Sequence, residues 1–280
     1  MCRVNFLSGN KGMKLGSRHV EKPWGRNQLP GHFTSTINQP VGEVWFVGDE
    51  YLPLLAKYLF TNENLSIQVH PDDEQARSRG HAAGKAECWF ILDAEPDAVI
   101  GLGLKHQVTP EDLRCATLNG SVGQLIAWRS VAAGDFFVVP PGTIHAIGAG
   151  ISLLEVQQNS DVTYRLYDYG RGRDLHLDDG IAVARCDRYS ESLFQKVDPS
   201  IEASLVDGPY FTLVHSLADA LQGRERLILP IDGHAAIGNE IARPGECLLL
   251  REHQRLESVA GRLLIGAAPR GEPVRLQAAA

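Results

Sequence analysis

The stretch Leu65–Pro71, LSIQVHP, and the later run Gly134–His145, GDFFVVPPGTIH, decide the fold of this chain. In the first stretch apolar and polar residues alternate, which predicts a strand with one buried face. Because strand side chains repeat every two residues, Gln68 and His70 lie on the same polar face. The second run predicts a buried strand, a Pro-Pro-Gly turn, and a new strand that begins at His145.

A carboxylate stands between these two runs, in the strand-like segment KAECWFIL, which contains Glu87. Together with Gln68, His70 and His145 it completes a set of four oxygen and nitrogen donors suited to a divalent metal such as zinc. A lone histidine in a strand is more often a hydrogen-bonded structural residue than a ligand. Four donors on matching faces favour a single metal ion per chain, with Gln68 the weakest ligand because its amide is neutral.

The spacing Gly134-x5-Pro140-x-Gly142-x2-His145 matches the second motif of the cupin superfamily, and Gln-x-His with a distant Glu matches the first. The longer strings LSIQVHPDD, KAECWFIL, PPGTIHAIGAG and LLEVQQNSDVTYRLYDYGR resemble type I mannose-6-phosphate isomerases in their short bacterial form. Weaker matches are KPWGRNQL and GEVWFVG. The resemblance covers roughly residues 18–190 in order.

The resemblance implies a zinc-dependent aldose–ketose isomerase that interconverts mannose 6-phosphate and fructose 6-phosphate through a cis-enediol. It also implies site residues: Lys85, Arg165 and Glu155 as catalytic groups, and Ser66, Lys85 and Arg165 as groups that bind the sugar phosphate. Lys85 corresponds to the lysine of the family's Lys-x-Glu motif, with Ala86 where the family has proline or threonine. The sequence does not divide acid–base and phosphate-anchoring work between Lys85 and Arg165.

Each of these residues has a plainer interpretation. In that interpretation Lys85 would be a solvated lysine beside a loop. Arg165 would be a strand-edge arginine paired with Asp161 or Asp168. Glu155 lies in an otherwise apolar strand, so it requires a partner if it is buried. Alternation along the strand-like run Thr163–Tyr167 predicts that Arg165 shares a face with Thr163 and Tyr167. Arg171 and Arg173 are interpreted as surface charges.

Composition excludes several classes of protein. A net charge of −7 over 280 residues argues against general nucleic-acid binding. No run approaches the ~20 apolar residues of a membrane span, and no secretory signal is visible. Five scattered cysteines without metal spacing indicate reduced thiols in a cytoplasmic protein. The sequence leaves a monomer and a homodimer equally open.

Many short strands between Gly and Pro residues predict an all-β fold with helical insertions, a cupin barrel of the jelly-roll kind. We expect a loose leader over residues 1–17 and a metal-binding cupin domain over 18–193. A helical insertion near 107–128 begins at the Thr109-Pro110 signature. Residues 194–275 repeat the strand pattern as a degenerate cupin-like unit, with Leu256 at the position equivalent to His145.

Three rival functions fit the same pattern. An iron dioxygenase on the cupin fold would use a similar ligand set. A sugar-binding module without turnover would keep the pocket, and a related isomerase would act on another sugar phosphate. Metal exchange, an activity assay and a panel of sugar phosphates separate them.

Overall fold

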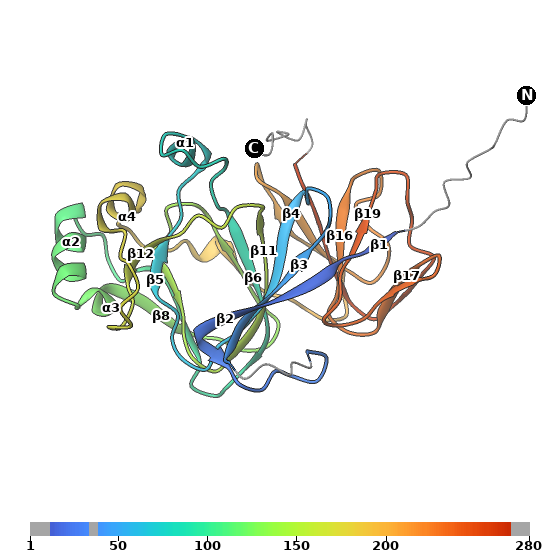
Figure 1. Ribbon diagram of the computed structural model, residues 1–280, viewed down its shortest axis with the longest axis horizontal. Coiled ribbons are helices and arrows are strands. Elements are labelled where there is room, and N and C mark those ends of the chain that lie inside the picture. The colour runs from blue at the N-terminus through green and yellow to red at the C-terminus, as the bar shows by residue number, and fades with distance from the viewer. Residues whose placement is uncertain (1–11, 34–38, 270–280) are drawn as a thin grey trace, which may run out of the picture. The chain divides into compact units, whose positions relative to one another are not determined.

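The computed structural model describes residues 12–33 and 39–269. The described chain forms two compact units. The larger unit comprises residues 18–45 and 54–198, and the smaller comprises residues 12–17, 46–53 and 199–269. Each unit is built mainly from strands (Figure 1).

A seven-stranded sheet forms one layer of the larger unit, in the order β13-β9-β6-β11-β4-β3-β2. Its strands are β2 (Gly16–Arg26), β3 (Val41–Val47), β4 (Leu54–Phe60), β6 (Glu87–Ala94), β9 (Asp135–Val139), β11 (Ile151–Gln158) and β13 (Phe194–Lys196). The long central strand β11 runs antiparallel to both β4 and β6. Because β13 pairs with β9, the larger unit continues past residue 193.

A five-stranded sheet forms the second layer, in the order β12-β5-β10-β7-β8. Its strands are β5 (Ile67–Val69), β7 (Val99–Leu104), β8 (Ile126–Ser130), β10 (His145–Ile147) and β12 (Tyr164–Tyr167). One apolar cluster joins the two layers, with Trp89 and Phe137 from the first sheet and Ile100 and Leu102 from the second. This antiparallel sandwich with a filled interior confirms the predicted all-β, jelly-roll class.

Three helices cover the outer face of the five-stranded sheet, beside β5, β8 and β12 (Figure 1). They are α2 (Pro110–Leu118), α3 (Val122–Leu125) and α4 (Leu177–Val183). A second apolar cluster lies there, in which Ile67 and Val69 of β5 join Leu113 of α2 and Ile181 of α4. The short helix α1 (Asp73–Arg77) and the 3₁₀ turn η1 (Glu191–Leu193) complete the unit.

The start of α2 follows the predicted signal. Thr109 caps α2 in a capping box with Asp112, and Pro110 is the first helical residue. Asp72 caps α1 in the same way with Gln75. The helical insertion breaks between α2 and α3, and it ends at Leu125 rather than near residue 128 because β8 begins at the next residue.

The smaller unit holds a six-stranded sheet, β1-β19-β16-β21-β15-β14, and a three-stranded sheet, β18-β17-β20. Its strands are β1 (Met13–Lys14), β14 (Ala203–Asp207), β15 (Thr212–Ser216), β16 (Arg226–Pro230), β17 (His234–Ile237), β18 (Glu240–Ala242), β19 (Leu248–Leu250), β20 (Ser258–Ala260) and β21 (Leu263–Ala267). Leu256 packs against the apolar cluster of this unit.

The expected leader falls mostly on residues 1–11, which lie outside the described residues. Its last part is strand, because Met13 and Lys14 pair with Leu249 and Leu248 of β19. Within the described ranges, no helix combines the length and the apolar character needed to cross a membrane.

Candidate metal centre and active-site pocket

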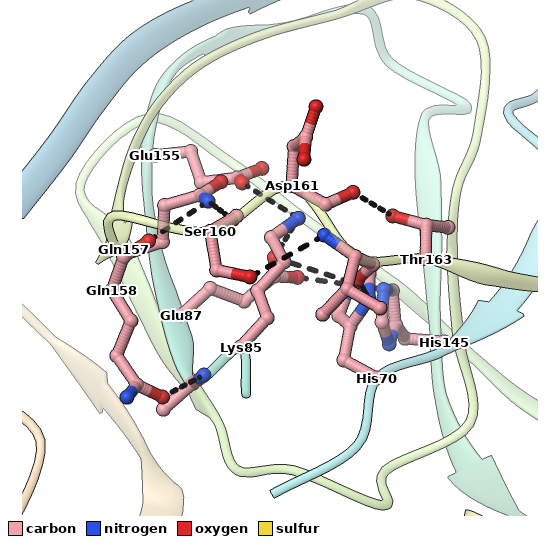
Figure 2. Close-up of polar contacts among 12 residues, drawn as sticks. His70, Lys85, Glu87, His145, Glu155, Gln157, Gln158, Ser160, Asp161 and Thr163 are labelled. Carbon is pink, nitrogen blue, oxygen red and sulfur yellow. Dashed lines mark hydrogen bonds and ion pairs between the residues drawn. The ribbon is translucent and has the colours of Figure 1, made fainter. Parts of the chain in front are cut away.

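Three of the predicted ligands meet inside the larger unit. His70 and His145 each place Nε2 3.4 Å from an oxygen of Glu87, one on Oε2 and the other on Oε1. All three side chains are buried, and their ligand atoms lie within 4.8 Å of one another (Figure 2). Among the residues that the structure describes, this is the one cluster of three or more His, Cys, Asp or Glu side chains with that geometry.

The outer nitrogens of both histidines fix the ring orientation. His70 Nδ1 lies 2.9 Å from the Val162 carbonyl oxygen, and His145 Nδ1 lies 2.9 Å from that of Thr143. Since a carbonyl only accepts, each Nδ1 carries the proton and each Nε2 presents a lone pair to the centre. Both Nε2 atoms and Glu87 Oε1 are buried and lack a well-aligned hydrogen bond to any described residue. Two imidazole nitrogens and a carboxylate oxygen without hydrogen-bond partners fit a divalent cation.

Local backbone chemistry assembles the triad. Gly142 in the Pro-Pro-Gly turn has a positive φ of 82° and donates its N–H to the His70 carbonyl oxygen at 2.8 Å. A Cβ at this glycine would lie 3.0 Å from the Val183 carbonyl oxygen, so the turn needs both the conformation and the space that glycine provides. Glu87 arrives from β6, where it is paired with Val139 of β9.

A polar cavity of about 260 Å³ lies beside the triad. Gln68 and Ser66, predicted from strand parity to share the face of His70, both line it. Gln68 is directly opposite His145 in the ladder between β5 and β10. The remaining lining residues are Lys22, Trp24, Glu43, Trp45, Lys57, Leu59, Leu65, Lys85, Glu155, Asp161, Thr163, Arg165 and Arg173.

Lys85 is a buried cation inside this cavity rather than a solvated loop residue. Its Nζ lies 2.7 Å from Glu87 Oε2 and 3.3 Å from Glu155 Oε1 (Figure 2). Glu155, as its place in an apolar strand requires, is also paired, with Lys57 Nζ at 3.1 Å. Lys85 therefore joins the candidate metal ligand Glu87 to a second buried carboxylate.

The ion-pair chain continues toward the pocket wall. Lys57 Nζ lies 4.0 Å from Glu43 Oε2, and Lys22 Nζ lies 3.4 Å from Glu43 Oε1. Trp45 donates its indole N–H to Glu43 at 2.5 Å, so these two residues share a face of β3. Lysines and glutamates thus alternate from the triad to Lys22.

Burial and neighbouring charges set the protonation of the centre. Burial lowers the pKa of His70 to about 3, with Lys85 acting in the same direction, so its imidazole is neutral. Burial also lowers the pKa of His145. For Glu87 burial alone would raise the pKa, but the Lys85 ammonium at 2.7 Å holds it well below its usual range. Burial and the Glu87 charge raise the pKa of Glu155.

Arg165 lines the cavity and is half-buried. Its Nη1 donates to the Asp174 carbonyl oxygen at 2.6 Å, and burial with the nearby Arg173 lowers its pKa. The alternative interpretation, an ion pair of Arg165 with Asp161 or Asp168, is not found among the described residues. Asp168 is instead contacted by Arg171 and by Arg173, whose Nε donates to it at 2.7 Å. Arg173, interpreted from the sequence as a surface charge, is thereby positioned on the cavity wall.

A bulge in β12 corrects the predicted alternation. The register with β5 shifts between Arg165 and Tyr167. Thr163 and Arg165 line the cavity, but Tyr167 packs against the apolar cluster under the helices. An extra residue in one strand reverses the faces that follow it, and no turn residue in this run signals the bulge.

Sequence reasoning missed three charged residues of the cavity, namely Lys57, Glu43 and Lys22. The sequence does contain a signal for Lys57: in the strand LLAKYLF all the remaining residues are apolar or aromatic. A lysine in such a strand is buried only with an anionic partner. Glu43 carries the same kind of signal between apolar neighbours in β3.

The triad and its cavity, held inside an antiparallel sandwich, define a cupin-type metal centre. Comparison with known proteins gives the family. The family described as "Phosphomannose isomerase type I, catalytic domain" matches residues 17–88. Mannose-6-phosphate isomerase of Streptococcus mutans is 40% identical in an alignment 245 residues long. The match covers 71% of this chain and 76% of that protein. The chain belongs to the type I phosphomannose isomerase family.

Further relatives agree. Mannose-6-phosphate isomerase ManA of Bacillus subtilis is 41% identical over 176 residues, 59% of this chain, and the match spans 55% of the length of that protein. The crystal structure of the mannose 6-phosphate isomerase from Bacillus subtilis superposes with a TM-score of 0.76 at 25% identity, covering 91% of this chain and 99% of that one. The crystal structure of a mutant phosphomannose isomerase from Salmonella typhimurium, 14% identical, covers 92% of this chain and 99% of that one with a TM-score of 0.74, which shows a common fold.

Proposed function

We propose that this protein is a zinc-dependent isomerase that interconverts mannose 6-phosphate and fructose 6-phosphate in the cytoplasm. The observation that carries the proposal is the buried His70–Glu87–His145 triad with Lys85 against it, in a polar cavity of a type I phosphomannose isomerase chain. The names of the relatives at about 40% identity supply the substrate.

Gln68, His70, Glu87 and His145 would hold the metal. When bound, a zinc ion would supply a Lewis acid that polarises O1 and O2 of the sugar. Two neutral imidazoles and one ionised carboxylate match the charge that zinc prefers in a site with an open position. The Gln68 amide, directly opposite His145, is the fourth and weakest ligand.

Isomerisation moves a proton between C2 and C1 of the open sugar, so the site needs a base and a route for the hydroxyl proton. Lys85 and Glu155 support that work, because they are in contact and face the cavity beside the triad. Lys57 touches the same Glu155 oxygen and also lines the cavity, which makes it a further proton-transfer group. Their burial excludes bulk water from the reacting carbons.

Arg165 would donate to the charge that develops on the enediol oxygens or, together with Ser66, bind the sugar phosphate, and Arg173 adds a second guanidinium on the same wall. A planar, permanently charged fork suits a phosphate dianion. Asp168 holds Arg173 in place through two of its nitrogens, so this cation is oriented before the substrate arrives. The degenerate smaller unit would serve packing.

The test is a coupled assay of the purified, zinc-loaded protein with mannose 6-phosphate, run together with metal analysis. We expect turnover and about one divalent ion per chain. A panel of glucose, mannose and ribose phosphates distinguishes a related isomerase, and oxygen uptake with iron distinguishes a dioxygenase. Metal binding without turnover of any sugar phosphate would leave a binding module and contradict the proposal.

A further inference from the structure

The larger unit also has a groove that shares no lining residue with the polar cavity beside the triad, called the catalytic cavity below. Its volume is about 360 Å³. Leu102, Leu104 and Ala127 form part of the wall, and the polar and aromatic lining is Lys105, Trp128, Arg129, Arg188, Tyr189 and Glu191. Three cations and one carboxylate line a groove on a protein whose net charge is −7.

Arg129 bridges the edges of the two sheets. It stands on β8, and its guanidinium lies over the rings of Phe137 on β9 and Phe194 on β13, at 5.8 and 5.1 Å from their centroids. Nη2 pairs with the mostly exposed Glu191 at 2.6 Å. Nη1 is buried and has no hydrogen-bond partner among the described residues. Arg129 therefore has one donor that no described acceptor satisfies.

The other two cations carry no ion pair among the described residues. Arg188 and Lys105 are both exposed. Asp187 is the carboxylate next to Arg188 in the sequence. It accepts the backbone N–H of Arg188 at 2.7 Å and forms no ion pair with the Arg188 guanidinium. The groove therefore keeps two unneutralised charges beside the half-satisfied Arg129.

A glycine bulge in β7 brings these groups together. The register between β7 and β8 shifts between Gly101 and Leu104. Gly103 has a φ of +64°, and a Cβ there would lie 2.5 Å from the Tyr189 nitrogen, so only glycine lets the segment carrying Arg188 reach this strand. At Gly101 a Cβ would lie 3.4 Å from the Trp128 ring, which shows the indole lying over the glycine.

We infer that this groove is a second binding site, for a small phosphorylated molecule with a planar ring. Its phosphate would be held by Arg129, Arg188 and Lys105, and its ring would pack on Trp128. Cations beside an aromatic wall are the combination that recognises phosphate monoesters of this shape, with charge-assisted hydrogen bonds for the anion and apolar contact for the ring. The inference does not depend on the proposed isomerase activity.

The test uses the zinc-loaded full-length protein and adenosine 5′-monophosphate as the probe, at fixed ionic strength. The readout is the ¹⁵N–¹H signal of the Trp128 indole, assigned with Trp128→Phe. We expect saturable shifts of this signal. Arg188→Gln and Lys105→Gln should each weaken the affinity by about tenfold, the usual effect of one charge-assisted hydrogen bond. Arg77→Gln, an exposed arginine of α1, is the charge-matched control and should change nothing.

Two companion titrations distinguish the sources of binding. Inorganic phosphate should bind more weakly than the nucleotide, and adenosine should not bind measurably. Equal affinity for phosphate and nucleotide would overturn the ring contact with Trp128. An unchanged Trp128 signal at millimolar nucleotide, or binding that Arg165→Gln abolishes and Arg188→Gln leaves intact, would assign the phosphate to the catalytic cavity and overturn the second site.

Discussion

Gln68 on β5 and His145 on β10 are direct cross-strand partners. Two residues that are 77 positions apart in the sequence therefore meet in one ladder, with their side chains on one face. This pairing explains why a Gln-x-His strand and a Pro-Pro-Gly-x-x-His turn occur together: the ladder places His70 and His145 at the distance that one carboxylate, Glu87, spans.

Removing either histidine should empty the metal centre. We expect His70→Ala and His145→Ala to lose both bound zinc and activity, because one histidine, Glu87 and the weak Gln68 ligand hold zinc poorly. Gln68→Ala should keep more metal, since a neutral amide contributes less. Metal analysis after dialysis measures the occupancy, and His32→Ala, at an exposed histidine, is the control. Full occupancy in either histidine variant would locate the metal elsewhere.

Arg165→Ala and Arg165→Lys should both lose a factor of about 10²–10⁴ in kcat, as expected when a donor to the transition state or a positioned proton-transfer group is removed. Lysine is a poor substitute because the fork geometry is lost. Zinc should remain bound. Steady-state kinetics provide the check, with Arg77→Ala as control. A rise in KM alone would make Arg165 a phosphate anchor that binds substrate and transition state equally.

The lysine–glutamate chain makes a prediction about stability. Lys57→Met should cost about 3–5 kcal/mol of unfolding free energy, because it leaves Glu155 and Glu43 buried with one fewer cation each. Adding Glu155→Gln should restore part of that loss. Denaturant titration measures both variants. Lys105→Met, at an exposed lysine, should change the stability by less than about 0.5 kcal/mol. A fully stable Lys57→Met protein would mean that the two carboxyl groups are protonated.

The histidines predict how the stability of the metal-free protein depends on pH. Burial keeps His70 neutral in the folded state down to about pH 3, and it lowers the pKa of His145 as well. In the unfolded chain both take up protons near pH 6.5. The unfolded state then binds more protons, so stability is lost as the pH falls below about 6.5.

Each histidine contributes at most about 1.4 kcal/mol per pH unit to that slope. Chelator-treated protein, unfolded by denaturant between pH 4 and 7, gives the measurement. The double variant His70→Gln/His145→Gln should flatten the dependence, whereas His32→Gln should not. A slope that the double variant leaves unchanged would show that other groups carry the titration.

Much of the centre could be predicted from the sequence, because its ligands lie on short strands whose parity is regular. Gln68, His70 and Ser66 share a face for that reason, and Glu87 and His145 start strands of their own. Alternation predicts the correct face for Arg165 but the wrong face for Tyr167, because the bulge between them depends on pairing with β5. Cross-strand register is a property of two segments, and one segment alone does not reveal it.

The charged cavity wall was harder to predict because its members come from distant strands. Lys57 and Glu43 stand on β4 and β3, and each is surrounded in sequence by apolar residues. Only the pairing of β3 with β4 brings them together. Similarly, Arg173 reaches the cavity because Asp168 holds it. That contact spans a polar turn, which has no periodic pattern from which it could be predicted.

The alternating chain contains three lysines, Lys22, Lys57 and Lys85, and three glutamates, Glu43, Glu87 and Glu155. These six charges cancel without help from an ion. Proteins whose ligand cluster repels itself need metal in order to fold, but here the repulsion is already relieved by ammonium groups. Synthesis and folding can therefore be complete before loading, and which cation enters is decided afterwards, by supply and exchange at a finished protein.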